Sequence, residues 1–168
     1  MTPRITAAGR RPGRAAPVPA ITRATARDAR RLTRLVRASG AYRGPYAPMI
    51  AGYRVGPDYI ETHQVFLATG PDDRLLGFYA LLLAPAELDL MFVADAAQGQ
   101  GVGRLLVAHM TGEARAAGLG AVRVVSHPPA EGFYRGVGAE RVGTVAANPP
   151  AVMWDRPELV IRVPAPSA

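Results

Sequence analysis

The chain has 168 residues, of which 49% are hydrophobic and 20% charged, and it contains no cysteine. This length suits one domain with a hydrophobic core of its own. The lack of cysteine excludes disulfides, cysteine nucleophiles and thiolate metal sites. The formal net charge is +7, and every cationic side chain is arginine, so mechanisms that use lysine as a Schiff base or general base are also excluded.

The positive charge is concentrated near the N-terminus. Residues 1–43 hold eleven arginines and one acid, Asp28, whereas the rest of the chain holds nine arginines and twelve acids. We expect a flexible basic leader at 1–17, one domain at 18–164 and a loose tail at 165–168. The leader lacks the apolar stretch of a signal peptide. No apolar run reaches the roughly 18 residues that cross a membrane, so we expect a soluble, cytoplasmic protein.

The sequence of the first half of the domain predicts one clear helix and four strands. A short strand at 19–23 precedes Thr25, which can cap a helix over 26–36 with its apolar residues on one face. Residues 41–60 are rich in Tyr, Pro and Gly and predict only a short irregular helix over 48–53. The apolar runs beyond them predict three further strands, at 64–69, 75–83 and 87–93.

The second half alternates between helices and strands. A glycine loop opens a helix predicted over 101–117, and a valine-rich strand follows at 121–126. A second helix and two weaker strands complete the pattern, at 128–137, 139–146 and 157–163. Strands that are first adjacent and then alternate with helices indicate an α/β fold, a mixed sheet with helices on both faces.

The segment Gln98-Gly99-Gln100-Gly101-Val102-Gly103 has the properties of an anion site. It opens an amphipathic helix, whose first N–H groups are unpaired and carry the positive end of the dipole. Glycines let a phosphate approach the backbone without interference from a Cβ. A Rossmann dinucleotide site is not indicated, because the third glycine of its G-x-G-x-x-G pattern would fall on Arg104. A nucleoside-triphosphate P-loop is not indicated either, because no Gly-Lys-Ser/Thr is present.

Because Gln98, Gly101 and Gly103 match the pattern Gln/Arg-x-x-Gly-x-Gly/Ala at a helix start, the segment resembles the GNAT superfamily of acyl-CoA-dependent N-acetyltransferases. The stretch Glu131-Gly-Phe-Tyr-Arg-Gly-Val-Gly resembles the second cofactor-side motif of that family. Asp95 departs from the family's early loop proline, and Ala139 from its Gly-aromatic step. The resemblance implies a GNAT-like, mostly antiparallel mixed sheet and transfer of an acetyl group from acetyl-CoA to a primary amine, by direct attack in a ternary complex.

The resemblance also implies roles for individual residues. The backbone of the strand before the loop would pair with the pantetheine arm, and the loop amides would hold the pyrophosphate. The implied cofactor-binding residues are Met91, Phe92, Val93, Gln98, Gly99, Gln100, Gly101, Val102, Gly103 and Arg104. Tyr134 occupies the place of the general acid that reprotonates the leaving thiolate.

The attacking amine must lose a proton, and two carboxylates are candidates for the base. Glu87 stands at the start of the strand, where family members with a carboxylate base often carry it. Asp89 follows two residues later, so an extended strand would present both carboxylates on one face. Mutual repulsion between them would raise one pKa. Glu61 and His63 stay open as substitutes, whereas His127 is expected to be a loop residue.

Other functions are compatible with the same sequence. A non-catalytic acyl-CoA-binding or sensing module would use the same glycine loop. A nucleic-acid-binding protein would use the arginine-rich arm, but the domain itself is slightly acidic, so nucleic acid is not the expected partner. The three histidines lack ligand-like spacing, so no metal site is predicted. The expected partners are acetyl-CoA and an amine, with no membrane, and a homodimer is compatible with the resemblance.

Four tyrosines precede the strand that starts at residue 64. They are Tyr42, Tyr46, Tyr53 and Tyr59. They lie in the segment that covers the acceptor side in proteins of this resemblance, which suggests a partly aromatic acceptor pocket. Packing against the sheet is the alternative role for these side chains.

Overall fold

Seven strands form one sheet in the computed structural model of this chain, which describes residues 17–167. The expected leader lies outside the described residues except for Pro17, and so does Ala168 of the expected tail. The sheet has the order β1-β2-β3-β4-β5-β7-β6. Its strands are β1 (Ala20–Arg23), β2 (Gln64–Thr69), β3 (Leu75–Leu83), β4 (Ala86–Val93), β5 (Ala121–Val125), β6 (Glu140–Val145) and β7 (Arg156–Arg162).

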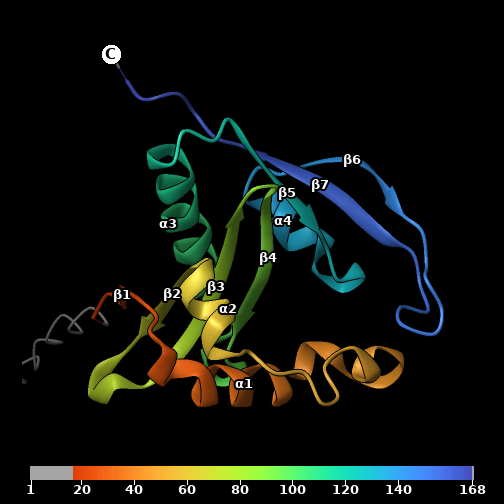
Figure 1. Cartoon of the computed structure of the whole chain (residues 1–168), viewed down its shortest axis with the longest axis horizontal. Coiled ribbons are helices and arrows are strands. Elements are labelled where there is room, and N and C mark those ends of the chain that lie inside the picture. The colour runs from red at the N-terminus through yellow and green to blue at the C-terminus, as the bar shows by residue number, and fades with distance from the viewer. Residues whose placement is uncertain (1–16, 168) are drawn as a thin grey trace, which may run out of the picture.

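The pairing between strands is antiparallel everywhere except between β4 and β5, which run parallel. This confirms the predicted mixed, mostly antiparallel sheet. The parallel pair touches at a single register position, Glu87 opposite Arg123. Beyond that position β5, β6 and β7 turn away from β2, β3 and β4, as Figure 1 shows. The sheet is therefore continuous at one end of β4 and open at the other.

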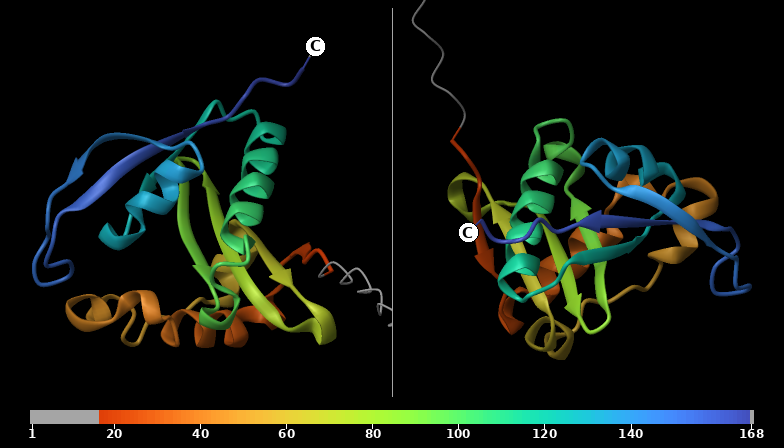
Figure 2. Two further views of the ribbon diagram at one scale, coloured as in Figure 1. Left: turned by 180° about the vertical axis from the view of Figure 1, so that it is seen from behind. Right: turned by 90° about the horizontal axis from the view of Figure 1, so that it is seen from above.

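Helices cover both faces of the sheet, as the sequence predicts. They are α1 (Ala29–Arg37), α2 (Pro57–Thr62), α3 (Val102–Ala116) and α4 (Glu131–Gly136). Leu32 of α1 and Ile60 of α2 share one buried cluster with Val65 and Phe78 of the sheet. The helices α3 and α4 pack on the opposite face, as the two views in Figure 2 show.

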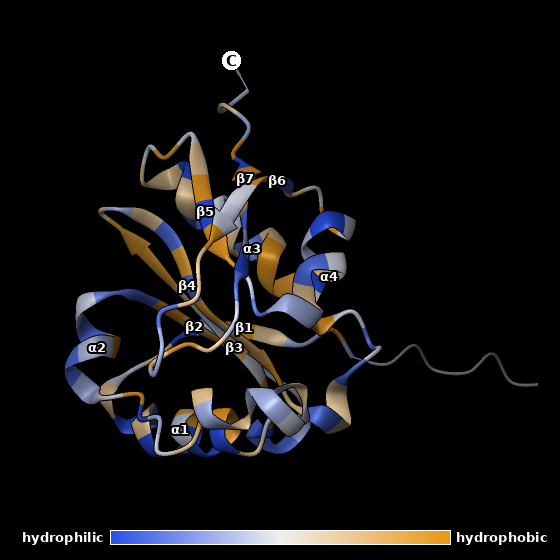
Figure 3. Cartoon of the chain, turned by 90° about the vertical axis from the view of Figure 1, so that its right-hand side faces the viewer, coloured by the Kyte–Doolittle hydropathy of each residue, from blue (hydrophilic) through white to orange (hydrophobic). Residues whose placement is uncertain are grey.

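The two buried clusters follow from the alternation of side chains along each strand. On β5 the residues Val122 and Val124 face the α3 side and are buried, whereas Arg123 between them faces the other way. In Figure 3 the hydrophobic colour is concentrated on the strands and on α3, while α1 and α2 carry hydrophilic stretches as well. Helices with one apolar stripe need that stripe covered, and the sheet covers it.

The structure differs from the prediction mainly before β2. Residues Gly44–Met49 form a 3-10 helix, earlier than the irregular helix expected at 48–53, and α2 was not predicted. Pro57 starts α2 because its fixed φ suits the first helical position. At the start of α1, a 3-10 turn at Ala26–Asp28 precedes the α-helix, and the Asp28 carboxylate accepts the Thr25 backbone N–H at 2.8 Å.

Within residues 17–167, no helix combines the length and the apolar character that crossing a membrane would take. The same residues contain no group of three His, Cys, Asp or Glu side chains placed to hold a metal ion.

Candidate active site

A β-bulge in β4 decides which side chains face the open part of the sheet. Ala80 is paired with Leu90 but Leu81 with Leu88, so Asp89 is the extra residue. The bulge reverses the alternation, because Met91 and Leu88 both pack on the α3 side of the sheet. Asp89 is thereby presented to the opposite side, where α2 lies.

A cavity of about 500 Å³ lies where β4 and β5 have separated. Its walls come from the end of β4, the glycine loop, the start of α3, and the segment that leads into α4. All of the residues implied to bind cofactor line this cavity except Gln100. Tyr134, the implied general acid, lines it as well. The fold therefore brings three separate sequence segments, 39–42, 91–104 and 127–134, to one cavity.

The glycine loop has the backbone that an anion site requires. Gly99 and Gly101 have φ angles of 73° and 80°, in the left-handed region that favours glycine. A Cβ added at either position would meet no atom within 4 Å. Leu105 donates the first intrahelical hydrogen bond, to the Gly101 carbonyl at 3.0 Å. The N–H groups of residues 102–104 precede that bond, so they are open to an anion.

The third glycine of the loop has a packing role. A Cβ on Gly103 would lie 3.0 Å from the Phe133 ring, tighter than nine in ten real Cβ contacts, so the ring would have to shift by a few tenths of an ångström. The start of α3 and the α4 helix therefore approach each other because residue 103 has no side chain. Arg104 adds a hydrogen bond from its guanidinium to the Gly136 carbonyl at 3.3 Å. Together these contacts set the width of the cavity.

Side-chain amides stabilise the loop itself. Gln98 donates from Nε2 to the Val93 carbonyl at 3.1 Å, and Gln100 donates to the Ala96 carbonyl at 3.3 Å. The first contact joins the loop to the end of β4. The second points the Gln100 side chain back along the chain, in keeping with its absence from the cavity wall.

Tyr134 is the buried polar group at the centre of this site. Its side chain is 7% exposed, and burial raises the pKa of its hydroxyl above the ordinary value, with Tyr42 adding to the rise. Its ring packs edge-on against Phe133, with centroids 5.2 Å apart. A phenol with a raised pKa keeps its proton throughout the neutral range, so Tyr134 can act as a hydrogen-bond or proton donor.

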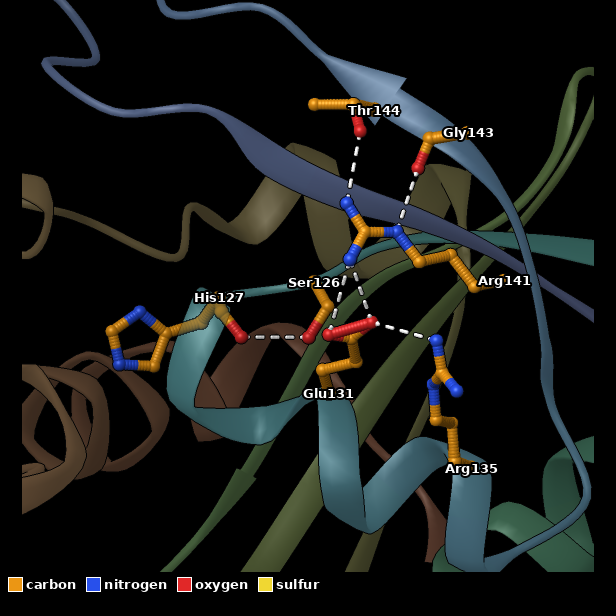
Figure 4. A network of polar contacts seen from close by, with 7 residues as sticks. All are labelled: Ser126, His127, Glu131, Arg135, Arg141, Gly143 and Thr144. Carbon is orange, nitrogen blue, oxygen red and sulfur yellow. Dashed lines mark hydrogen bonds and ion pairs between the residues drawn. The ribbon is translucent and has the colours of Figure 1, made fainter.

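An ion-pair network fixes the helix that carries Tyr134. The Glu131 carboxylate accepts from Arg141 at 3.0 Å and from Arg135 at 3.2 Å, which joins α4 to β6. Arg141 also donates to the Thr144 hydroxyl at 2.9 Å. Figure 4 shows this network and, pointing away from it, the imidazole of His127.

The segment after α1 closes one side of the cavity. Tyr42 stacks on His127, with ring centroids 4.1 Å apart, and on Phe92 at 5.6 Å. His127 interacts through Nε2 with the Ala41 carbonyl at 2.8 Å, and burial lowers the pKa of its imidazole. The Asp95 carboxylate, which stands where the family pattern has proline, accepts the Gly40 backbone N–H at 3.0 Å. Asp95 therefore holds this segment against the loop.

A second cavity, of about 210 Å³, adjoins the first on the α1 side. The two cavities share Tyr134 and His127 on their walls. Asp89 lines the second cavity, and its carboxylate accepts a hydrogen bond from the Tyr59 hydroxyl. Arg156 lines it from β7. The second cavity thus holds one carboxylate and one guanidinium.

The other candidate bases lie elsewhere. Glu87 forms an ion pair with Arg123 at 3.4 Å and lies outside the walls of both cavities. Glu61 is exposed, and His63 packs edge-on against Tyr59, with centroids 4.7 Å apart. Of the four carboxylate or imidazole groups considered from the sequence, Asp89 is the one that reaches a cavity.

Several residues on the cavity walls were assigned no role in the chemistry from the sequence. His127 was expected to be a loop residue, and Pro129 and Arg156 were given no role, yet all three line a cavity. Phe133, which was noted only as part of the second cofactor-side motif, lines the first cavity as well. Tyr42 agrees with the aromatic acceptor pocket suggested by the four tyrosines, and so does Tyr53. His127 and Arg156 carry no local pattern, because only the folding of β5 and β7 beside β4 brings them to the site.

Comparison with known families decides the assignment. The sequence profile of the acetyltransferase (GNAT) domain matches residues 55–148, which is more than half of the chain. The chain belongs to the GNAT family of acetyltransferases. It is therefore an enzyme of the acyltransferase class, as the resemblance of the glycine loop implied. No protein of curated function matches the chain at a significant level.

Solved GNAT structures share the fold at low sequence identity. A GCN5-related N-acetyltransferase from Rhodopseudomonas palustris has a TM-score of 0.73 and 19% identity, over 90% of this chain and 99% of that one. The ribosomal-protein-S18-alanine N-acetyltransferase from Escherichia coli has a TM-score of 0.64 and 16% identity, over 89% and 96%. A family member from Elizabethkingia anophelis with acetyl-CoA bound has a TM-score of 0.54 and 18% identity, over 62% and 79%.

Proposed function

We propose that this GNAT enzyme transfers an acetyl group from acetyl-CoA to a primary amine by direct attack, with both substrates bound at once. The single observation that supports this most strongly is the first cavity. One hollow of about 500 Å³ combines the glycine loop, the open end of β4 and the buried hydroxyl-bearing residue Tyr134. A solved relative of the same fold holds acetyl-CoA.

The cofactor would lie along the first cavity. Its pyrophosphate would accept hydrogen bonds from the loop amides and the open N–H groups at the start of α3. Residues 91–93 pair with β3 on one edge, and β5 has already diverged on the other. The pantetheine amides could therefore add to β4 as an extra strand would. This would aim the thioester toward Tyr134.

The chemistry requires two proton movements. The amine nitrogen attacks the thioester carbon, an N–C bond forms, and the C–S bond breaks with its electron pair leaving on sulfur. Tyr134 would donate a hydrogen bond and then a proton to this thiolate. The nitrogen must release a proton, and Asp89 would receive it directly or through water; its position on the wall of the adjoining cavity supports this role. Glu87 stays the second candidate.

The test uses the purified full chain and two measurements. Calorimetry should detect binding of acetyl-CoA and coenzyme A, and a thiol-release assay over a panel of primary amines should show turnover with at least one of them. Absence of affinity for both cofactor forms would refute the proposal. Binding without thiol release for any amine would favour the non-catalytic acyl-CoA-binding module instead.

A further inference from the structure

The guanidinium of Arg156 has no ion-pair partner among residues 17–167. Arg156 is half-buried at the start of β7 and lines the second cavity. Within residues 17–167 it makes no ion pair, and its Nε atom is buried without a hydrogen-bond partner. A cation withdrawn from water without a counter-charge costs free energy. That cost falls when an anion occupies the cavity.

The neighbouring charges on the same face of the sheet are already paired with one another. Arg123 of β5 forms ion pairs with Glu158 at 3.0 Å and with Glu87 at 3.4 Å. Glu158 is two residues after Arg156 on the same face of β7, but its carboxylate is directed to Arg123. Arg156 is therefore the cation on this face that is left for a ligand.

The second cavity has one negative and one positive side chain on its walls. Asp89 comes from β4 and Arg156 from the start of β7, and β5 lies between these two strands in the sheet. The two charges act on different tyrosines of the wall. Burial raises the pKa of Tyr53, and Asp89 raises it further, whereas burial and Tyr53 raise the pKa of Tyr42 and Arg156 opposes that rise. The wall is thus negative on the β4 side and positive on the β7 side.

From this arrangement we infer that the acceptor is an amino acid, a small molecule that carries a primary amine and a carboxylate. The inference rests on the proposed acetyl transfer and specifies its substrate class. The carboxylate pairs with Arg156, whose planar fork of N–H donors matches a carboxylate. The amine lies toward Asp89 and Tyr134, beside the first cavity.

The size and the remaining walls of the cavity agree with such a ligand. Its volume of about 210 Å³ suits a molecule of amino-acid size. Beside its polar groups, the cavity wall includes the apolar side chains of Val36, Met49 and Ile50. These side chains favour an apolar side chain on the acceptor.

The experiment compares matched acceptors in the thiol-release assay with saturating acetyl-CoA. The panel pairs leucine with isopentylamine and phenylalanine with phenethylamine, and it includes the corresponding methyl esters. The free amino acids should have a kcat/KM about tenfold or more above that of their carboxylate-free partners, the advantage expected of a charge-assisted pair. An equal or higher kcat/KM for the carboxylate-free amines would overturn the inference.

Variants of Arg156 separate the carboxylate contact from general effects on the enzyme. Arg156→Gln should raise KM for the amino acid by about 10-fold to 100-fold and leave the carboxylate-free amine within about twofold. Arg156→Lys should restore part of the loss because it keeps the charge. Arg162→Gln is the matched control, since Arg162 is exposed at the other end of β7. An equal loss for both acceptors in Arg156→Gln would overturn the inference.

Two further readouts keep this inference distinct from the proposed function. Thermal unfolding and acetyl-CoA calorimetry on each variant show whether the fold and the cofactor site are intact. Turnover of simple amines without any turnover of amino acids would overturn the acceptor class and leave acetyl transfer standing. If the unmodified chain did not bind acetyl-CoA, the proposed function itself would be refuted.

Discussion

At the scale of single residues, burial gives Tyr134 its chemical character. A phenol in water has a pKa of about 10, and burial raises it here, so the hydroxyl is protonated at every pH at which the enzyme would be assayed. A residue that stays protonated is useful as a donor to a developing thiolate and unsuited to act as a base. Tyr134 also lines both cavities, the proposed sites of the acyl donor and of the acceptor.

We therefore expect Tyr134→Phe to lower kcat by about 100-fold or more, since a general acid usually contributes about 10²-fold to 10⁴-fold. Acetyl-CoA affinity should change by less than about twofold, because the hydroxyl acts on the leaving sulfur. In a profile of kcat against pH, the unmodified enzyme should show no decline caused by deprotonation of Tyr134 below about pH 10. Below that pH its profile should therefore have the same shape as that of the variant. Steady-state kinetics and calorimetry provide both quantities.

Tyr79→Phe is the control, since Tyr79 is fully buried, lines neither cavity and donates to or accepts from His109 at 2.8 Å. That variant should lose stability without losing turnover. If Tyr134→Phe retained full turnover, the assignment of the acid would be wrong.

The residue scale also shows how far sequence patterns reach. The sequence made Glu87 the first candidate for the base and Asp89 the second, on a strand that was taken to be uninterrupted. The bulge at Asp89 and the ion pair of Glu87 with Arg123 give them different surroundings. Both features depend on the register with β3 and on the approach of β5. No local pattern around residues 87–89 encodes either of them.

At the scale of elements, the connection from β4 to α3 was predicted closely because its signal is local. Glycine is the residue that adopts positive φ without strain, and Gly99 and Gly101 both do so. The helix expected at 101–117 is observed at Val102–Ala116. In contrast, α2 is six residues long and lies in a segment rich in Tyr, Pro and Gly. Its helical form depends on burying Ile60 against the sheet.

We expect Gly101→Val to abolish measurable acetyl-CoA binding. The added side chain would stand on a residue that lines the first cavity, next to the proposed pyrophosphate position, and would strain a backbone with a φ of 80°. The strain should lower the free energy of unfolding by about 1–2 kcal/mol. Calorimetry and chemical denaturation measure the two effects separately.

Gly118→Val is a matched control because Gly118 has a φ of 78°, has open space at its Cβ position and follows the far end of α3. It should show a similar loss of stability and normal acetyl-CoA binding. An equal loss of acetyl-CoA binding in both variants would show that backbone strain, and not damage to the anion site, causes the loss.

At the scale of the whole molecule, the site exists because the sheet is held together at one end and open at the other. The strands β4 and β5 meet in the register of Glu87 with Arg123 and then separate. Arg123 joins three strands there, through Glu87 of β4 and Glu158 of β7. Both cavities lie between the separated parts.

We expect Arg123→Gln to destabilise the fold modestly. The Arg123 side chain is 40% exposed, so solvent screens its two ion pairs, and their loss should cost about 0.5–1 kcal/mol. For a chain of this size that corresponds to a fall in Tm of about 2 °C. Differential scanning calorimetry at low and high salt provides the measurement, and the difference should shrink in high salt. The fall in Tm should be larger for Arg123→Gln than for Arg162→Gln. Equal falls in Tm would show that the ion pairs of Arg123 do not stabilise the fold.

The sequence by itself determined the features that neighbouring residues encode. Three features could be predicted from the sequence because backbone conformation and side-chain alternation are local properties. They are the glycine loop with its helix, the apolar runs that become β2 and β3, and the Phe133-Tyr134 pair. Only the tertiary structure decided that Asp89 faces the α2 side and lines the second cavity, that His127 and Tyr42 stack at the first cavity, and that Arg156 has no ion-pair partner within residues 17–167. These depend on a bulge set by pairing with β3 and on strands that come together from distant parts of the chain.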